Sequence, residues 1–118
     1  MRDAETRIVL EIRTYRLTPG GPARFGELLD GEVGALLRDF GIRVVRHGPS
    51  LIDPQWYVLI RAFASLEERE ELEGRFYGST IWKEHYKDSL LSRVESYHDI
   101  VLDVPASVAD DLADRAAI

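Results

Sequence analysis

Hydrophobic and polar residues alternate along residues 7–17 (RIVLEIRTYRL), a pattern typical of a β-strand, and the run ends at Thr18-Pro19-Gly20-Gly21. One face of this strand is apolar and carries Ile8, Leu10 and Ile12. The other face is polar and carries Glu11, Arg13 and Tyr15. A strand that ends at Pro-Gly and leads into a helix begins a β-α-β unit, so the chain is expected to mix strands and helices.

One helix and two strands follow in the pattern. Apolar residues recur at steps of three and four over residues 22–40, which predicts one long helix weakened by Gly26, Gly31 and Gly34. Residues 42–47 and 55–64 are expected to be strands. The second of these is apolar on both faces, as a central strand covered on both sides would be.

The C-terminal half adds helix and then strand. Ser65 and Glu68 form a capping box that predicts the start of a second helix. A further helical piece is expected over residues 80–91 and a last strand over residues 93–104. Beyond Ala106 the chain could form a short helix with Val108 and Leu112 inward, or it could fray.

This order, β-α-β-β-α-β, predicts an α+β protein with the ferredoxin-like plan. Right-handed crossovers make the first and third strands central neighbours. Both helices then lie on one face of a four-stranded antiparallel sheet. We expect one domain over residues 7–104, with flexible or accessory termini at residues 1–6 and 105–118.

Composition narrows the choice of partners. Among 118 residues, 15 are Lys or Arg and 21 are Asp or Glu, and no basic cluster is present, which argues against nucleic-acid binding. Cysteine is absent, which excludes disulfides, thiolate metal sites and cysteine nucleophiles. Residues 1–6 are polar, and no stretch has the length of a membrane span, so we expect a cytoplasmic protein without a membrane partner.

The sheet predicts self-association. Two helices cover only one face, and the other would expose an apolar patch larger than the roughly 300–600 Å² usual on monomers. Packing two sheets face to face about a two-fold axis removes that exposure, so a homodimer is expected. The alternative is a monomer whose tail or helical segment folds over the open face.

Four motifs carry a resemblance to a known family. They are Glu11-Ile12-Arg13-Thr14-Tyr15 with Thr18-Pro19-Gly20, the helix bearing Phe25, the run Arg61-Ala62-Phe63-Ala64 leading to Arg69, and Trp82. In this order and spacing they resemble the NIPSNAP family over residues 8–103, although Ala62 departs from the aromatic that usually follows the arginine. The resemblance implies a dimeric α+β barrel. Related barrels include cofactor-free monooxygenases, haem-degrading enzymes, cyclases and plain binding proteins, so it implies no single reaction.

The polar residues of the central strands are the first candidates for a site. Alternation places Glu11, Arg13 and Tyr15 on one face, joined by Tyr57, Arg61, Glu95 and Tyr97 from the neighbouring strands. Buried ions cost several kcal/mol each unless they are paired. Two interpretations stay open. The charges could form a structural network such as Glu11–Arg61 or Arg13–Glu95, or they could line a wet cavity in which arginine grips an anionic or carbonyl-bearing ligand.

Histidines and aromatic residues complete the candidate set. His47, His85 and His98 show no metal-binding spacing, so no metal is predicted. Histidine suits proton transfer near neutral pH, and the catalytic candidates are Arg13, Arg61, His47 and His98. The ligand-binding candidates are Glu11, Tyr15, Tyr57, Trp82, Tyr86 and Tyr97. Core packing is the alternative role for the aromatic residues.

Three functions fit these residues, and the sequence does not decide whether the protein is an enzyme. The first is a homodimeric barrel with a small-molecule pocket that needs no cofactor and acts as an oxygenase, cyclase or isomerase on a carbonyl-rich or aromatic metabolite. Arg13 or Arg61 would stabilise enolate charge, and a histidine or tyrosine would move the proton. The second is a non-catalytic homo-oligomeric binding or scaffold protein with a structural ion network. The third is a haem-binding barrel with His47 or His85 as axial ligand.

Overall fold

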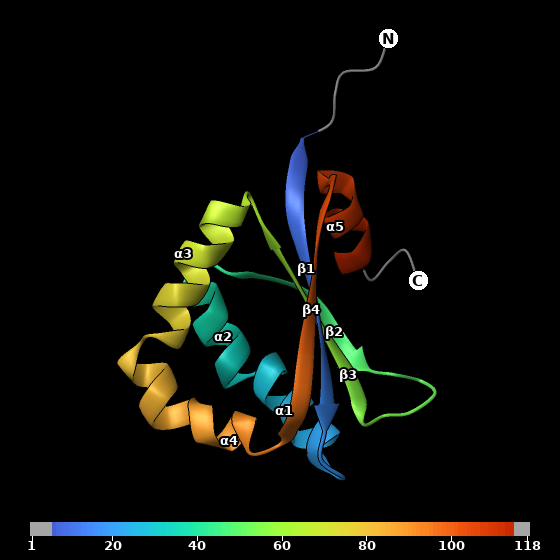
Figure 1. The fold of residues 1–118 in the computed structure, drawn as a ribbon, viewed down its shortest axis with the longest axis vertical. Coiled ribbons are helices and arrows are strands. Elements are labelled where there is room, and N and C mark those ends of the chain that lie inside the picture. The colour runs from blue at the N-terminus through green and yellow to red at the C-terminus, as the bar shows by residue number, and fades with distance from the viewer. Residues whose placement is uncertain (1–5, 115–118) are drawn as a thin grey trace.

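The computed structural model describes residues 6–114. Four strands form one antiparallel sheet in the order β2-β3-β1-β4 (Figure 1). The strands are β1 (Arg7–Leu17), β2 (Arg43–Pro49), β3 (Trp56–Phe63) and β4 (Val94–Pro105). The first and third strands are the central neighbours, as the right-handed crossovers predict.

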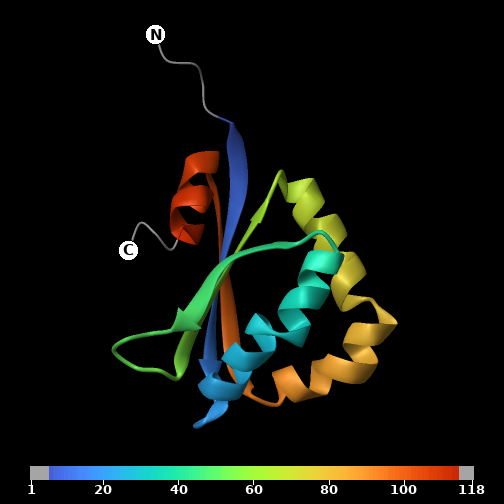
Figure 2. The ribbon, with the colours of Figure 1, turned by 180° about the vertical axis from the view of Figure 1, so that it is seen from behind.

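Helices lie on both sides of this sheet. One side carries α1 (Gly21–Asp30), α2 (Glu32–Asp39), α3 (Leu66–Tyr77), the π-helical segment η1 (Trp82–Tyr86) and α4 (Lys87–Leu91). The last helix, α5 (Ala106–Ala113), lies on the opposite side (Figure 2). The ferredoxin-like α+β fold is therefore confirmed, with α5 added beyond the predicted plan. Within residues 6–114, no helix combines the length and the apolar character needed to cross a membrane.

The long helix expected over residues 22–40 is divided in two. Gly31 leaves the helical conformation, with φ −109° and ψ −114°, and separates α1 from α2. Past this bend, a Cβ on Gly34 would lie 2.0 Å from the carbonyl oxygen of Leu29, so only glycine fits there. The bend lets both helices pack against the sheet, where they bury Phe25, Leu28, Leu29, Val33, Leu36 and Leu37.

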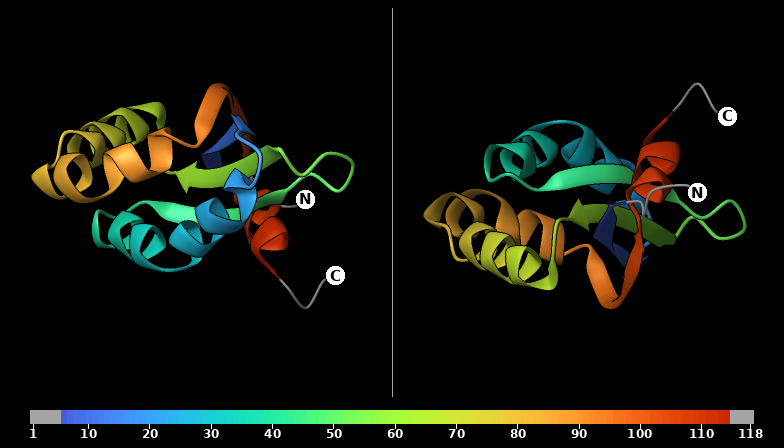
Figure 3. Two further views of the ribbon diagram at one scale, coloured as in Figure 1. Left: turned by 90° about the horizontal axis from the view of Figure 1, so that it is seen from below. Right: turned by 90° about the horizontal axis from the view of Figure 1, so that it is seen from above.

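The second helical stretch begins and ends near its predicted bounds. The Ser65 hydroxyl oxygen accepts a hydrogen bond from the Glu68 backbone N–H at 3.1 Å, which caps α3 as expected. The segment η1–α4 falls within the predicted helical piece and differs from a regular α-helix by its π-helical turn. Viewed from either end of the long axis, the α1–α2 pair and the α3–η1–α4 segment stand side by side on one side of the sheet (Figure 3).

The register of the strands fixes which side chains share a face. Glu11 lies opposite Arg61, and Tyr15 lies between Tyr57 on β3 and Tyr97 on β4. These residues face the helices, as alternation predicts. The helix-covered face of the sheet therefore carries the polar residues that the sequence singled out.

The opposite face of the sheet is only partly covered. Ala109 of α5 is fully buried, and Val108 and Leu112 pack inward, as the sequence allowed. This helix covers one end of the face, whereas Trp56, Ile100 and Leu102 stay 47%, 51% and 41% exposed. Residues 106–113 of the predicted accessory terminus are thus an ordered helix, and residues 1–5 and 115–118 lie outside the described part of the chain.

Candidate functional site

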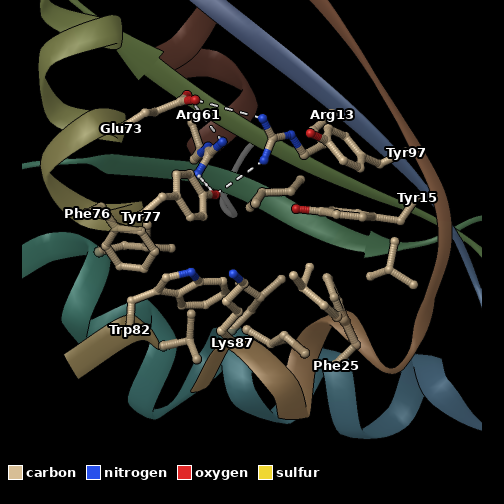
Figure 4. A pocket seen from close by; sticks show the side chains of 17 residues that line it. Arg13, Tyr15, Phe25, Arg61, Glu73, Phe76, Tyr77, Trp82, Lys87 and Tyr97 are labelled. Carbon is tan, nitrogen blue, oxygen red and sulfur yellow. Dashed lines mark hydrogen bonds and ion pairs between the residues drawn. The ribbon is translucent and has the colours of Figure 1, made fainter. Parts of the chain in front are cut away.

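A cavity of about 380 Å³ lies between the helix-covered face of the sheet and the helices (Figure 4). Its volume falls within the range of about 300–1,000 Å³ usual for small-molecule sites. Its apolar wall contains Phe25, Leu29, Val33, Leu37, Leu59, Phe76, Trp82 and Leu90. Its polar wall contains Arg13, Tyr15, Arg61, Glu73 and Tyr77. The space beside Arg13 and Arg61 is therefore open rather than filled by side chains.

Behind the polar wall, six charged side chains from four elements form one ionic network: Glu11, Arg13, Arg61, Arg69, Glu73 and Asp99. Glu11 accepts hydrogen bonds from Arg61 Nε at 2.8 Å and Arg69 Nε at 2.7 Å. Arg13 donates to both oxygens of Asp99, at 2.6 and 2.9 Å. This bidentate geometry is the strongest form of a guanidinium–carboxylate pair.

Glu73 and Asp99 close the network. A Glu73 oxygen lies 3.2 Å from Arg61 Nη2, and the other lies 3.8 Å from Arg13 Nη2. Asp99 also approaches Arg69 at 3.3 Å. Every carboxylate in the network therefore faces at least two guanidinium groups, which offsets the cost of removing these charges from water.

Of the two ion pairs predicted from the sequence, one is confirmed and the other is wrong. Glu11 does pair with Arg61, and both side chains are fully buried. Arg13 pairs with Asp99 rather than with Glu95, because the register places Asp99 directly opposite Arg13. Glu95 lies 3.9 Å from Arg16 instead, beside the irregularity where the pairing of β1 and β4 shifts.

The network and the cavity coexist, so the two interpretations of the buried charges do not exclude each other. No buried side-chain nitrogen or oxygen in the described residues lacks a hydrogen-bond partner. Arg13, Arg61 and Glu73 belong to the network and also line the cavity. The same side chains thus satisfy one another and present a polar wall to whatever occupies the space.

Tyr77 is the focus of the polar wall. Its hydroxyl oxygen accepts hydrogen bonds from Arg61 Nη1 at 2.9 Å and from Arg13 Nη1 at 3.2 Å (Figure 4). A tyrosine hydroxyl has one proton of its own to donate. Because Tyr77 also lines the cavity, a ligand oxygen can receive that hydrogen bond.

Glu73 is an acidic residue of the cavity wall whose pKa is shifted towards neutrality. Burial and its hydrogen bond with Glu11 raise the pKa of Glu73 to about 7. Burial alone would raise the pKa of Glu11 as well, but the hydrogen bond with Glu73 and the charges of Arg61 and Arg13 lower it instead. A carboxyl group that titrates near neutrality can carry a proton in acid–base chemistry.

Two residues lie near the mouth of the cavity. The Arg13 guanidinium carbon lies 4.7 Å from the centre of the Tyr97 ring, a cation–π contact at the end of the polar wall. Lys87, the first residue of α4, lines the cavity and directs its ammonium group into it beside Trp82 (Figure 4).

Five of the predicted ligand or catalytic residues meet around this cavity, and Glu11 lies behind its wall. The five are Arg13, Tyr15, Arg61, Trp82 and Tyr97. Tyr86 packs against the apolar core instead and does not line the cavity. The set of candidates predicted from the sequence lacks four residues that the structure brings to this site: Glu73, Asp99, Lys87 and Tyr77.

The structure does not bring the two histidine candidates to Arg13 and Arg61. His47 lies in a second, more open hollow beside α1, where Nδ1 is 2.6 Å from the Tyr57 hydroxyl and Nε2 is 2.8 Å from Asp30 Oδ1. Burial raises the pKa of Tyr57 to about 12. His98 pairs with Thr14 on the open face of the sheet. No histidine of residues 6–114 lines the cavity, so neither His47 nor His85 is placed to be an axial haem ligand there.

The fold and the site together define a class of protein. It is a ferredoxin-like α+β domain with a cavity of small-molecule size between sheet and helices, and charged side chains form part of the cavity wall. The sequence model of the NIPSNAP family matches residues 10–107, and the chain belongs to this family. No curated protein matches the chain.

Solved structures share the fold. A NIPSNAP family protein from Agrobacterium tumefaciens superposes with a TM-score of 0.76 at 20% identity, covering 90% of this chain and 93% of that one. A second NIPSNAP family protein of unknown function from the same species gives a TM-score of 0.71 at 24% identity, covering 89% and 95%. A candidate antibiotic biosynthesis monooxygenase from Nitrosomonas europaea gives 0.64 at 12% identity, covering 88% and 95%. At these identities the likeness concerns the fold alone.

Proposed function

We propose that this NIPSNAP family protein binds a small, partly aromatic molecule with a carbonyl group in the cavity between sheet and helices. The observation that carries the proposal is the division of the cavity wall into a hydrogen-bonding part and an apolar part. A carbonyl oxygen beside Tyr77 would receive its O–H hydrogen bond, backed by Arg13 and Arg61. An aromatic ring would then lie against Phe25 and Trp82.

The same geometry supports acid–base chemistry on that carbonyl compound. Ionised Glu73 would take a proton from the carbon next to the carbonyl, and the electron pair of the broken C–H bond would form the enolate. Tyr77 and its two guanidinium partners would stabilise the negative charge on the oxygen. Return of the proton from Glu73 to another carbon of a conjugated enolate completes an isomerisation. Alternatively, the enolate carbon attacks a second carbonyl of the same molecule, and the resulting alkoxide takes the proton back from Glu73, which completes a cyclisation.

Glu73 takes the role that the sequence gave to a histidine or tyrosine. It lies four residues before Tyr77 on α3, so both side chains project from the same face of the helix. Its pKa, which burial raises to about 7, suits a group that accepts and returns a proton at neutral pH.

Deuterium exchange into a model ketone tests binding and chemistry together. Calorimetry with 2-tetralone is expected to show saturable binding, and mass spectrometry in D₂O is expected to show protein-dependent deuterium uptake next to its carbonyl. Glu73→Gln should abolish the uptake while binding persists. Binding without any uptake would favour the non-catalytic binding protein, and an absence of binding at millimolar ketone would overturn the proposal.

The partner in this proposal is a second copy of the chain, packed through the open face of the sheet. Ile12, Ile60 and Ile100 lie side by side across β3, β1 and β4 on that face. Exposed Trp56 and Leu102 extend the apolar surface, and α5 covers only one end of it. Light scattering at micromolar concentration is expected to give twice the protomer mass, and a monomer would contradict this part of the proposal.

A further inference from the structure

The charges around the cavity do not cancel. In the ionic network, three guanidinium groups face three carboxylates: Arg13, Arg61 and Arg69 against Glu11, Glu73 and Asp99. When all six are ionised, the network is neutral. Lys87 is a further cation of the cavity wall, and no ion pair within residues 6–114 includes it. The cavity therefore carries one positive charge that the described protein leaves unmatched.

The π-helical turn explains how Lys87 reaches the cavity. The backbone N–H of Lys87 bonds to the carbonyl oxygen of Trp82, five residues earlier. In a regular α-helix, residues five apart point about 140° away from each other. The wider turn of a π-helix brings them towards the same face, and such turns are frequent at functional sites. Both Trp82 and Lys87 thereby line the cavity.

Lys87 lies on the opposite side of the cavity from the polar wall (Figure 4). Figure 4 shows its ammonium group across the cavity from Arg13 and Arg61, with Trp82 beside Lys87 and Tyr77 beside the two arginines. A ligand that hydrogen-bonds to Tyr77 at one end thus has a cation near its other end. Lys87 is exposed to solvent in the protein alone, and a ligand that fills the apolar space beside it would shield the ammonium group from water and strengthen its attraction for an anion.

We infer that the ligand of this cavity is a partly aromatic monocarboxylate, with its single negative charge paired to Lys87 and its uncharged end at Tyr77. The inference deepens the proposed function and rests on it. A neutral ligand gains no attraction from the exposed Lys87, and a dianion leaves one negative charge without a partner, since every guanidinium group of the network already has carboxylate partners.

Three probes that share a naphthalene ring and differ in charge test the inference by calorimetry. They are 2-naphthamide, 2-naphthoate and naphthalene-2,6-dicarboxylate, which carry no, one and two negative charges. The titrations are run at pH 8, where Glu73 is mostly ionised and the network is neutral. The monoanion is expected to bind at least tenfold more tightly than the amide and more tightly than the dianion.

Lys87→Met tests the residue itself, because it removes the charge and keeps a long apolar side chain. It should weaken 2-naphthoate at least tenfold and leave 2-naphthamide within about threefold of its original affinity. Lys83→Met is the matched control, since Lys83 is, like Lys87, an exposed lysine of the same helical segment but does not line the cavity. It is expected to change neither affinity.

The outcomes separate this inference from the proposed function. Equal affinities for 2-naphthoate and 2-naphthamide would overturn the inference alone, because cavity binding would stand. A tighter dianion, or a Lys87→Met variant that weakens both probes equally, would overturn it too. If none of the three probes binds while 2-tetralone does, the inference alone is lost, and if 2-tetralone does not bind either, the proposed function is lost with it.

Discussion

The helix-covered face and the open face of the sheet carry different kinds of side chain. On the helix-covered face, Glu11 and Arg61 are fully buried charges. On the open face of the same strands, Ile12, Ile60 and Ile100 form an apolar row. The face that the helices shield from water thus holds buried charges beside its apolar core, and the face that they leave open holds an exposed apolar row. A simple amphipathic sheet would have neither.

The difference assigns a separate task to each face. Replacing buried ion pairs with apolar side chains of similar volume is often neutral or stabilising, so a buried network is weak evidence of a need for stability. Here the network walls a cavity, which gives it a role in binding. An apolar face has no such role within one protomer, and it fits contact between copies. Binding is therefore expected inside the domain and assembly outside it.

Removing Arg61 should have the largest effect of any change to the covered face. Arg61→Met leaves the fully buried Glu11 carboxylate with Arg69 as its one hydrogen-bonded arginine. Loss of one partner of a buried ion pair costs about 3–5 kcal/mol. Urea denaturation at pH 7 is expected to show a fall of that size in the free energy of unfolding.

Arg7→Met is the control for this substitution, because Arg7 pairs with Asp103 on the protein surface. An exposed pair contributes no more than about 1 kcal/mol. Arg13→Ala should fall between the two, since Arg13 is largely buried and holds Asp99. If Arg61→Met proved as stable as Arg7→Met, the network would line the cavity without supporting the fold.

A charge at the centre of the open face should break assembly and spare binding. Ile100 lies opposite Ile12 and is half exposed in the protomer. Ile100→Asp would place an unpaired carboxylate in the proposed interface between copies. We expect the dimer dissociation constant to rise at least about 100-fold, equivalent to about 2.8 kcal/mol. Light scattering over a concentration series measures it.

The control places the same charge on the far side of the domain. Lys83→Asp alters an exposed residue of the helical layer and should leave the dimer intact. The affinity of Ile100→Asp for 2-naphthoate should also match that of the original chain, because Ile100 does not line the cavity. A dimer that persists in Ile100→Asp would show that the copies associate through another surface.

The pH dependence of binding tests the covered face more finely. Because burial raises the pKa of Glu73 to about 7, its carboxylate gains a proton as the pH falls from 8 to 6. The network then has one positive charge in excess, from its neighbours Arg13, Arg61 and Arg69 against Glu11 and Asp99. The affinity for 2-naphthoate should therefore rise as the pH falls, by up to about tenfold or 1.4 kcal/mol.

Glu73→Gln should flatten this pH profile and hold the affinity near its low-pH value, because glutamine has the neutral charge of the protonated acid. The probe itself stays ionised across the range, since a carboxyl group has a pKa of about 4. An affinity that rises towards pH 8, or a profile that survives in Glu73→Gln, would assign the titration to another group.

Much of this architecture follows from local patterns. Alternation along β1 was enough to place Glu11, Arg13 and Tyr15 on one face, and the crossover rule placed Arg61 next to them. The choice of Asp99 over Glu95 depends on the register near the β1–β4 irregularity, which alternation alone does not locate. Asp99 lies two residues after Tyr97 on β4 and therefore on the same face of the sheet, so alternation could have identified it.

The cavity and its helical residues were harder to predict. Arg69, Glu73 and Tyr77 recur at steps of four on α3, a spacing that predicts one shared face and could have identified Glu73. Lys87 depends on a π-helical turn, and the bend between α1 and α2 depends on the conformation of Gly31. The volume between sheet and helices depends on how those irregular segments pack together, which no spacing in the sequence reports.

The smallest expected effect concerns α5, the helix on the open face. Leu112 is partly buried against Leu10, Val45 and Ala62, so Leu112→Ala should lower the free energy of unfolding by about 1 kcal/mol. Asp111→Ala, at an exposed neighbouring position, should change it by less. Because Leu112 lies across the sheet from the cavity, the affinity for 2-naphthoate should not change. If Leu112→Ala weakened binding as much as it weakened folding, the two faces of the sheet would be coupled, and the division between binding and assembly would fail.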